Sequence, residues 1–190
     1  MSQTRSETFS FPGSQGHELA ARLDLPEGAV RGYALFAHCF TCSKDVFAAS
    51  RISRGLAERG IAVLRFDFTG LGASAGDFGN TDFSSNVADL VAAADAMRQR
   101  LAAPALLVGH SLGGAAVLAA AGDVPEARCV ATLNAPADPA HIAHLFKDRQ
   151  EEIAEAGAAE VTIGGRAFTI RRDFLEDIAE QRMQDRIAGL

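Results

Sequence analysis

A serine stands between two glycines at residues 109–113 (GHSLG), with a strand-like segment before it and a helix-like segment after it. The apolar run at residues 105–108 is typical of a buried strand, and the alanine-rich run at residues 115–121 predicts a helix that ends at Gly122. A G-x-S-x-G turn between a strand and a helix describes a nucleophile elbow, in which the serine backbone is strained. The hydroxyl then lies at a helix N-terminus, which favours negative charge. Ser111 is therefore predicted to be a nucleophile.

A serine nucleophile needs a base that takes its proton and a carboxylate that orients the base. Asp138, His141 and His144 follow an expected strand, where loops reach the carboxyl end of a sheet. The two histidines are three residues apart and share a helical face, so one hypothesis is an improvised Ser111–His141 pair. The alternatives are that Asp138 is the N-cap of a helix beginning at Pro139 and that the histidines are packing residues.

Two further patterns compete with this interpretation. Residues 39–42 (CFTC) form a C-x-x-C between a strand and a helix, which in another setting indicates a redox or metal site. The glycines of residues 70–76 (GLGASAG) resemble a dinucleotide fingerprint, but the next helix begins only near Thr81 or Asp82, too late to meet a diphosphate. Asp67 is then expected to accept hydrogen bonds from loop amides.

Composition sets the broad class. The chain has 190 residues, of which 48% are hydrophobic, enough for one substantial core. Its net charge of −6 and its scattered basic residues argue against a nucleic-acid partner. Three cysteines without a secretory signal favour a reducing compartment. The N-terminus is polar, and no apolar run is long enough to span a bilayer. We therefore expect a soluble cytoplasmic protein that does not bind membranes.

Strand-like and helix-like segments alternate, which predicts an α/β fold with a doubly wound, mostly parallel sheet. The expected strands are residues 8–11, 19–25, 33–37, 61–66, 105–108 and 129–133, and the expected helices are residues 46–56, 83–101 and 115–121. From Pro139 the chain becomes more charged, and it reads as a helix, a hairpin with a Gly164-Gly165 turn, and a helix from Arg171. We expect residues 1–138 to form the core and residues 139–190 to form a helical and hairpin cap or lid, or plain packing elements.

With these features in view, the chain resembles an α/β-hydrolase. More narrowly, it resembles the bacterial hydrolase domain often fused to an OsmC-like, peroxide-handling domain. The resemblance covers nearly the whole chain. It rests on the elbow and on residues 37–45 (AHCFTCSKD), 66–74 (FDFTGLGAS) and 134–136 (NAP).

The resemblance implies an oxyanion hole. In this family the loop after the third strand carries a His-Gly-x pattern, and its third residue donates one oxyanion-hole amide. Carried onto this sequence, the donors are the backbone N–H groups of Phe40 and Leu112, and Cys39 replaces the usual glycine. His38 is expected to support the loop by hydrogen bonding rather than to act as the base.

The resemblance also implies that two catalytic groups, the acid and the histidine, are missing from this sequence. In such enzymes the acid and the histidine follow the serine, on loops after the last strands. No histidine follows His144, and no strand that could carry these groups is recognisable before Leu190. We therefore expect a C-terminally truncated or short hydrolase domain whose last strands are absent and whose triad is incomplete.

Two function classes follow. The first is a serine hydrolase, esterase-like, that transfers the acyl group of a small ester, thioester or amide to water through Ser111, with no metal or organic cofactor. The second is a non-catalytic hydrolase-fold module, or a partial domain, that pairs with another chain. Missing strands would leave an exposed sheet edge, through which the chain could form a homodimer.

Overall fold

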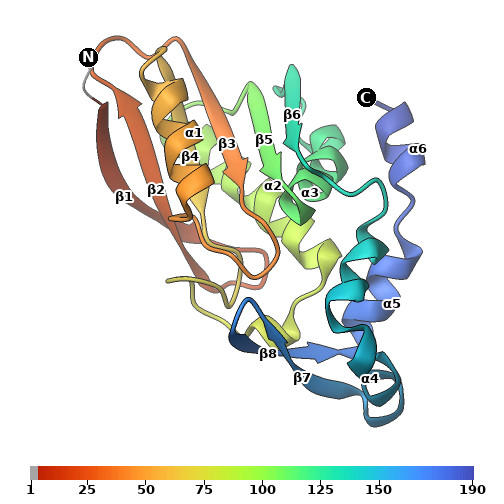
Figure 1. Ribbon diagram of the computed structural model, residues 1–190. Coiled ribbons are helices and arrows are strands. Elements are labelled where there is room, and N and C mark those ends of the chain that lie inside the picture. Colours follow the sequence, from red (N-terminus) through yellow and green to blue (C-terminus); the bar gives the residue numbers. More distant parts are fainter. Residues whose placement is uncertain (1–3) are drawn as a thin grey trace.

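A central sheet of the order β1-β2-β4-β3-β5-β6 organises the computed structural model, which describes residues 4–190 (Figure 1). The strands β3 to β6 are parallel to their neighbours in this group, whereas β2 is antiparallel to both β1 and β4. The expected doubly wound, mostly parallel sheet is therefore confirmed. The bounds are β1 (Thr4–Pro12), β2 (Glu18–Pro26), β3 (Gly32–Ala37), β4 (Ile61–Phe66), β5 (Leu106–His110) and β6 (Cys129–Leu133).

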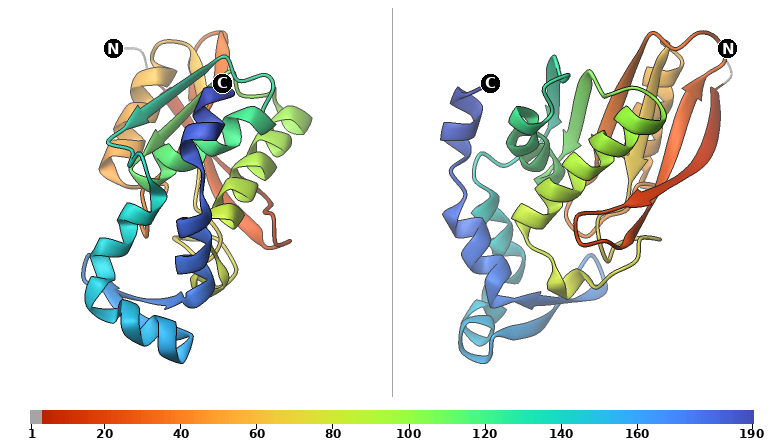
Figure 2. Two further views of the ribbon diagram at one scale, coloured as in Figure 1. Left: turned by 90° about the vertical axis from the view of Figure 1, so that its right-hand side faces the viewer. Right: turned by 180° about the vertical axis from the view of Figure 1, so that it is seen from behind.

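Helices cover both faces of this sheet. Helix α1 (Phe47–Ala57) packs on one face, and α2 (Phe83–Arg100) and α3 (Leu112–Ala120) pack on the other (Figure 2). Helix α2 begins at a capping box, in which the Asp82 carboxylate accepts a hydrogen bond from the Ser85 amide and the Ser85 hydroxyl faces the Asp82 amide. The central strands β3, β4 and β5 are largely buried, as parallel strands covered on both faces must be.

The parallel register brings three loops to one edge. Ala34 of β3 lies opposite Val63 of β4 and Leu106 of β5, so these strands end side by side. The segments that follow them begin at His38, Asp67 and Ser111. Residues far apart in the sequence therefore meet at the carboxyl edge of the sheet, where ligands bind in open α/β sheets.

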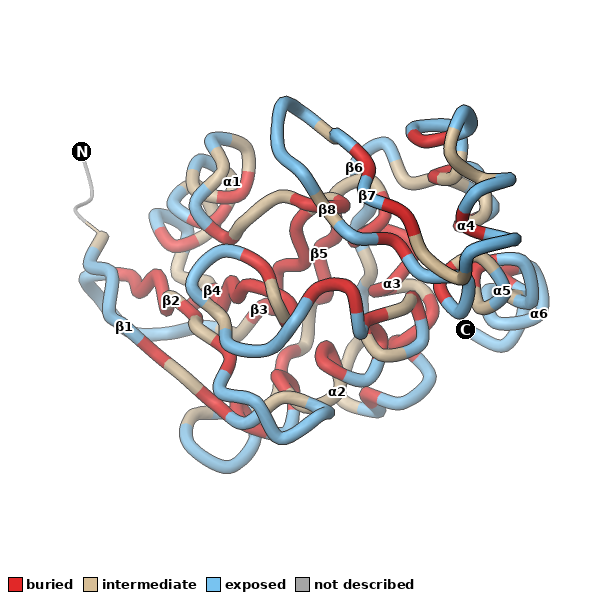
Figure 3. The backbone as a smooth tube through the Cα atoms, turned by 90° about the horizontal axis from the view of Figure 1, so that it is seen from below, coloured by how far each residue is buried: buried red, intermediate tan, exposed pale blue. Residues whose placement is uncertain are grey.

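The C-terminal segment (residues 139–190) lies at that same edge and then returns along α3 (Figures 1 and 3). The expected hairpin is present, and its turn uses Gly164 and Gly165 with φ of 58° and 78°, which glycine adopts without strain. Its strand β8 packs against the short helix η1 (Phe78–Asn80) of the sheet domain. The elements are η3 (Pro139–Arg149), α4 (Gln150–Ala156), β7 (Ala158–Ile163), β8 (Arg166–Arg171), α5 (Arg172–Glu180) and α6 (Met183–Ala188).

One element differs from the prediction. The helix expected from Pro139 is a pair of 3-10 turns, interrupted at Phe146, whose φ of −138° is not helical. The Phe146 ring is almost fully buried, with its centroid 6.4 Å from that of Phe174 in α5. Burial of this ring against a distant helix outweighs the local preference for a continuous helix.

Strand β6 forms an edge of the sheet, and it differs sharply from its neighbours in burial. It pairs with β5 on one side, and no other strand of residues 4–190 pairs with its outer side. Four of its five residues are exposed, whereas five of the six residues of β4 are buried. Within residues 4–190 this edge of the sheet is therefore unpaired, and the elbow strand β5 stays covered because β6 lies outside it.

Candidate active site

The turn from β5 into α3 has the strained geometry that the G-x-S-x-G spacing predicts. Ser111 has φ of 54° and ψ of −126°, a region that residues with a side chain rarely adopt. Its amide donates a 2.9 Å hydrogen bond to the Leu133 carbonyl at the end of β6, which holds the turn against the neighbouring strand. No side chain of residues 4–190 hydrogen-bonds to the Ser111 hydroxyl. The hydroxyl is thus presented at the helix N-terminus.

The glycines on either side of Ser111 are required by close backbone contact. A Cβ atom on Gly109 would lie 2.3 Å from the Gly113 carbonyl oxygen, and one on Gly113 would lie 2.2 Å from the His38 carbonyl oxygen. Both distances are shorter than atoms tolerate. The second contact also shows that the elbow packs directly against the loop that follows β3.

That loop contains a tight turn over residues 39–42. The Cys42 amide donates a 3.1 Å hydrogen bond to the Cys39 carbonyl, and a disulfide joins the two side chains. Thr41, inside the turn, has φ of 58°. Within residues 4–190 only Thr41, Ser111 and Asn134 combine a side chain with positive φ, and all three follow strands of the parallel sheet. Strained backbone of this kind clusters at functional sites.

The amides of Phe40 and Leu112 have no hydrogen-bond acceptor within the described chain. Leu112 is the first residue of α3, so its N–H is one of the free donors of a helix N-terminus. Phe40 lies inside the 39–42 turn, and both residues line one pocket. The structure therefore brings together the two residues that the sequence nominated as oxyanion donors.

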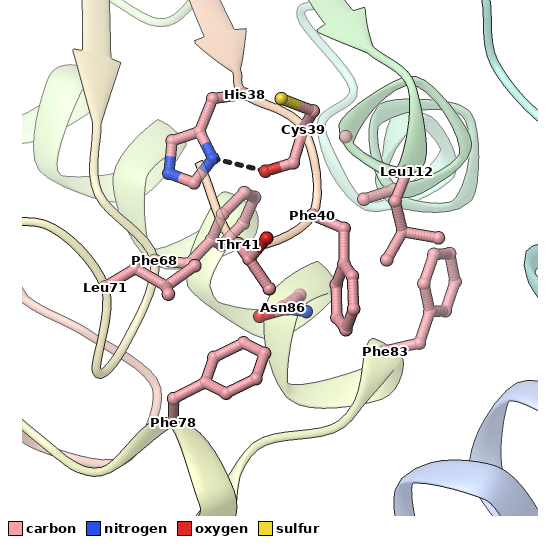
Figure 4. A pocket seen from close by; sticks show the side chains of 12 residues that line it. His38, Cys39, Phe40, Thr41, Phe68, Leu71, Phe78, Phe83, Asn86 and Leu112 are labelled. Atoms are coloured by element: carbon pink, nitrogen blue, oxygen red, sulfur yellow. Dashed lines mark hydrogen bonds between the residues drawn. The ribbon is translucent and has the colours of Figure 1, made fainter. Parts of the chain in front are cut away.

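This pocket is small and mostly apolar, and it lies beside the elbow (Figure 4). Two aromatic side chains of the C-terminal segment pack against the pocket walls. Phe174 stacks on Phe40 at 5.4 Å between ring centroids, and Phe168 contacts Phe78 at 5.1 Å. The side chain of Asn86 also lines it and has no hydrogen-bond partner among residues 4–190. Its apolar side chains are those of Phe40, Phe68, Leu71, Phe78, Phe83, Leu112 and Ala116.

His38 supports the loop, as the sequence predicts. Its Nδ1 lies 2.8 Å from the Cys39 carbonyl, so this nitrogen carries the proton. Its Nε2 is buried without a hydrogen-bond partner and lies 4.0 Å from Asp67 Oδ1. Burial lowers the pKa of His38 below its usual value of 6.5, and this desolvation outweighs the opposing effects of the Cys39 carbonyl and the Asp67 carboxylate. The ring is therefore neutral and structural.

Asp67 is the anchor of the loop. Its carboxylate accepts hydrogen bonds from the backbone amides of Lys44 and Ala73 and from the Lys44 ammonium, at 2.5, 2.9 and 2.7 Å. Asp67 and Lys44 are both buried, so removal of Lys44 would leave the Asp67 carboxylate without its closest cationic partner. The predicted role of Asp67 as an acceptor for loop amides is confirmed.

The three residues considered as an alternative source of the base and its carboxylate do not line this pocket. Asp138 caps η3 by accepting a hydrogen bond from the Ala140 amide at 2.9 Å. His141 and His144 are exposed, and their rings face each other at 4.6 Å between centroids. No hydrogen bond of residues 4–190 connects any of the three to Ser111. The structure thus supports the capping role of Asp138, and the Ser111–His141 pair stays a hypothesis.

One residue that contacts the site, Arg166, was not predicted from the sequence. Its guanidinium, at the tip of the β7–β8 hairpin, donates a hydrogen bond to the Thr41 carbonyl inside the 39–42 turn. The two residues are separated by 125 positions, so no local pattern could have found this contact. Arg166 connects the C-terminal segment to the loop that carries the Phe40 amide.

Neither a metal cluster nor a membrane span is found in the described chain. No group of three or more His, Cys, Asp or Glu side chains in residues 4–190 is arranged to hold a metal ion. None of the helices within this range is long and apolar enough to cross a membrane.

Comparison with known proteins agrees with this architecture. A model of the Alpha/beta hydrolase family matches residues 34–189. The crystal structure of an esterase domain from a Rhodothermus marinus protein is 46% identical, with a TM-score of 0.71 over 96% of this chain and 71% of that chain. Curated protein sequences give no match.

Two further solved structures are more distant. A serine hydrolase without a lid, XC6422 from Xanthomonas campestris, is 29% identical, with a TM-score of 0.62 over 70% of this chain and 62% of that chain. Est1E from Butyrivibrio proteoclasticus, solved with ferulic acid bound, is 22% identical, with a TM-score of 0.72 over 93% of this chain and 72% of that chain, and shows the fold alone. The family match and the 46% identity together establish that this chain belongs to the alpha/beta hydrolase family.

Proposed function

We propose that the protein is a serine hydrolase of esterase type in which Ser111 is the nucleophile and the amides of Phe40 and Leu112 form the oxyanion hole. One observation carries this proposal. A strained serine and two backbone amides without acceptors meet at one apolar pocket, although they come from loops far apart in the sequence. Membership of a family with esterase relatives supports a hydrolase.

The chemistry follows from this arrangement. The Ser111 oxygen attacks the carbonyl carbon of the substrate, and the carbonyl oxygen acquires negative charge in the tetrahedral intermediate. Two fixed amides aimed at that oxygen stabilise it, and one good donor contributes roughly 3 kcal/mol. The leaving group departs with a proton, and water then cleaves the acyl-enzyme and restores the serine.

This mechanism also needs a base that accepts the proton of the Ser111 hydroxyl. We propose that the triad is incomplete within residues 4–190, because none of their side chains hydrogen-bonds to the Ser111 hydroxyl. The proton acceptor is then His141, in a rearranged position, or a group outside residues 4–190. The narrower kinship with hydrolase domains fused to OsmC-like domains, and the cytoplasmic location, stay predictions.

The pocket favours a small apolar acyl group. Its walls are mainly aromatic and aliphatic side chains, which stabilise apolar groups removed from water. The Asn86 amide, without a partner in the described chain, offers one hydrogen bond to a polar atom of the substrate. We therefore propose esters or thioesters of short acyl chains rather than charged substrates.

Labelling with a fluorophosphonate probe tests this function, because such probes report a serine hydroxyl activated by a base. We expect the wild type to be labelled and Ser111→Ala to remain unlabelled while keeping the same circular dichroism spectrum. The variant His141→Ala separates the two sources of the base. Lost labelling assigns the base to His141, whereas unchanged labelling excludes it. No labelling of folded wild-type protein would contradict the proposal.

The open edge of β6 favours a second candidate, a non-catalytic module that pairs with another copy. An unpaired edge offers a row of backbone donors and acceptors to a second strand. This candidate predicts a dimer that dissociates on dilution in sedimentation velocity experiments. Thr132→Pro should disrupt it, because residues 129 and 133 bond to the β5 side and Thr132, between them in the alternation, faces the outer edge. A monomer at all concentrations would exclude edge pairing.

A further inference from the structure

We propose that Cys39 and Cys42 form a reversible thiol–disulfide site whose reaction partner is a dithiol reductant, and that the disulfide form holds the Phe40 amide in place. The effect on Ser111 rests on the function proposed above, whereas the thiol chemistry and the change in the turn do not.

The disulfide closes a turn that contains a proposed oxyanion donor. Cys39 and Cys42 are the first and last residues of the turn, with their Cα atoms 5.3 Å apart. Phe40 and Thr41 lie between them, and Figure 4 shows these two residues with Cys39. The backbone hydrogen bond from the Cys42 amide to the Cys39 carbonyl closes the same turn. The cross-link therefore restrains the backbone of Phe40, whose amide is a proposed oxyanion donor.

This turn needs restraint because Thr41 has positive φ. A β-branched residue at φ of 58° is strained, and the left-handed region is one that glycine occupies readily. Such a conformation persists only when the surrounding structure over-determines it. Once the cross-link is opened, Thr41 is free to relax toward negative φ, and that rotation turns the peptide planes on both sides of it.

Two other contacts keep the turn from collapsing when the disulfide opens. His38 donates to the Cys39 carbonyl, and Arg166 donates to the Thr41 carbonyl. We therefore expect reduction to loosen the turn rather than unfold it. The effect on Ser111 should be smaller than the ~10²–10³-fold loss that follows removal of a whole oxyanion donor.

The site is accessible and separate from the third cysteine. Cys39 and Cys42 are both half-buried, so part of each residue is exposed to solvent and to a small dithiol. Cys129 is exposed on β6, in another part of the sheet, and is not part of the disulfide. It provides an internal reference for counting thiols.

One dithiol molecule supplies the two electrons and two protons that reduction of the Cys39–Cys42 disulfide requires. A thiolate of the reductant attacks one sulfur of the pair, forming a mixed disulfide and releasing the other cysteine as a thiolate that takes up a proton. The second thiolate of the reductant then displaces the remaining cysteine sulfur. The protein disulfide gains two electrons and two protons, and the reductant is oxidised to its own disulfide.

The first experiment counts thiols in the folded Ser111→Ala variant. Alkylation followed by intact-mass measurement should find one reactive thiol in the oxidised protein and three after treatment with dithiothreitol. Hydrogen exchange of the peptide covering residues 38–46 should be faster in the reduced form. Three free thiols under oxidising conditions, or equal exchange rates in both forms, would overturn the proposal.

The second experiment measures the rate of fluorophosphonate labelling of Ser111. Reduction, or the double variant Cys39→Ser with Cys42→Ser, should slow labelling about tenfold. Adding Thr41→Gly should restore much of the rate in the reduced form, because glycine holds positive φ without a cross-link. The matched control Cys129→Ser should keep the full redox response.

The outcomes separate the two proposals. Equal labelling rates in the oxidised and reduced forms would overturn the redox effect while leaving Ser111 as the nucleophile. If neither form is labelled although the turn stiffens on oxidation, the Ser111 proposal fails, and the thiol–disulfide site stands on its exchange data. Thermal unfolding of each variant identifies any loss of rate that is due to misfolding.

Discussion

Two turns at the carboxyl edge of the sheet hold a residue with a side chain at positive φ, but they hold it by different means. Ser111, at φ of 54°, is fixed by close packing of two glycines and by a backbone hydrogen bond to β6. Thr41, at φ of 58°, is fixed by a disulfide and by a hydrogen bond from Arg166 of the C-terminal segment. The first set of restraints consists of backbone packing within the sheet, whereas we expect the second to open without unfolding the protein.

The largest effect is expected at the elbow. The variant Gly113→Ala places a Cβ atom 2.2 Å from the His38 carbonyl oxygen and 2.7 Å from that of Ala37. Backbone on both sides must move, so we expect the free energy of unfolding to fall by at least about 3 kcal/mol in urea titrations. The control Gly122→Ala meets no atom within 4 Å and should change it by less than about 1 kcal/mol.

A smaller, purely functional effect is expected at the other turn. Arg166→Ala removes the donor to the Thr41 carbonyl, and because Arg166 is exposed we expect less than about 1 kcal/mol of stability loss. Labelling of Ser111 should slow about fivefold, which corresponds to roughly 1 kcal/mol. Arg171→Ala, on the exposed end of the same strand, should not slow it. A loss of stability that matches the loss of rate would argue against a positioning role.

A third effect concerns the dependence of stability on pH. His38 is neutral in the folded protein, because burial lowers its pKa below 6.5, whereas the unfolded chain binds a proton there near that pH. Its contribution to stability is therefore present above pH 6.5 and is lost as the pH falls below that value, by at most about 1.4 kcal/mol per pH unit. Urea titrations between neutral pH and about pH 5 measure this slope.

The variant His38→Asn should flatten that slope, since asparagine can still donate to the Cys39 carbonyl but does not titrate. The exposed histidine in His17→Asn serves as the control and should leave the slope in place. An unchanged slope in His38→Asn would show that other groups govern the acid sensitivity of this protein.

The sequence predicts those parts of the molecule that local patterns determine. The bounds of β4 and β6 agree with the expected residues 61–66 and 129–133, and the elbow has the strained serine that its glycines imply. The break at Phe146 and the contact of Arg166 with Thr41 were not predictable, because both depend on packing between distant segments. The C-x-x-C spacing permits a disulfide, but spacing alone does not distinguish a cross-link from free thiols.

The strand order also determines when the reactive serine can exist during folding. Strand β5 reaches its place beside β3 only after the chain has closed the long loop through α1, β4 and α2, and such distant pairings form slowly. The elbow additionally needs Leu133 from β6 and the backbone of His38 from the end of β3. A chain with only its local structure formed therefore has no strained serine, because the elbow exists only when β3, β5 and β6 lie side by side.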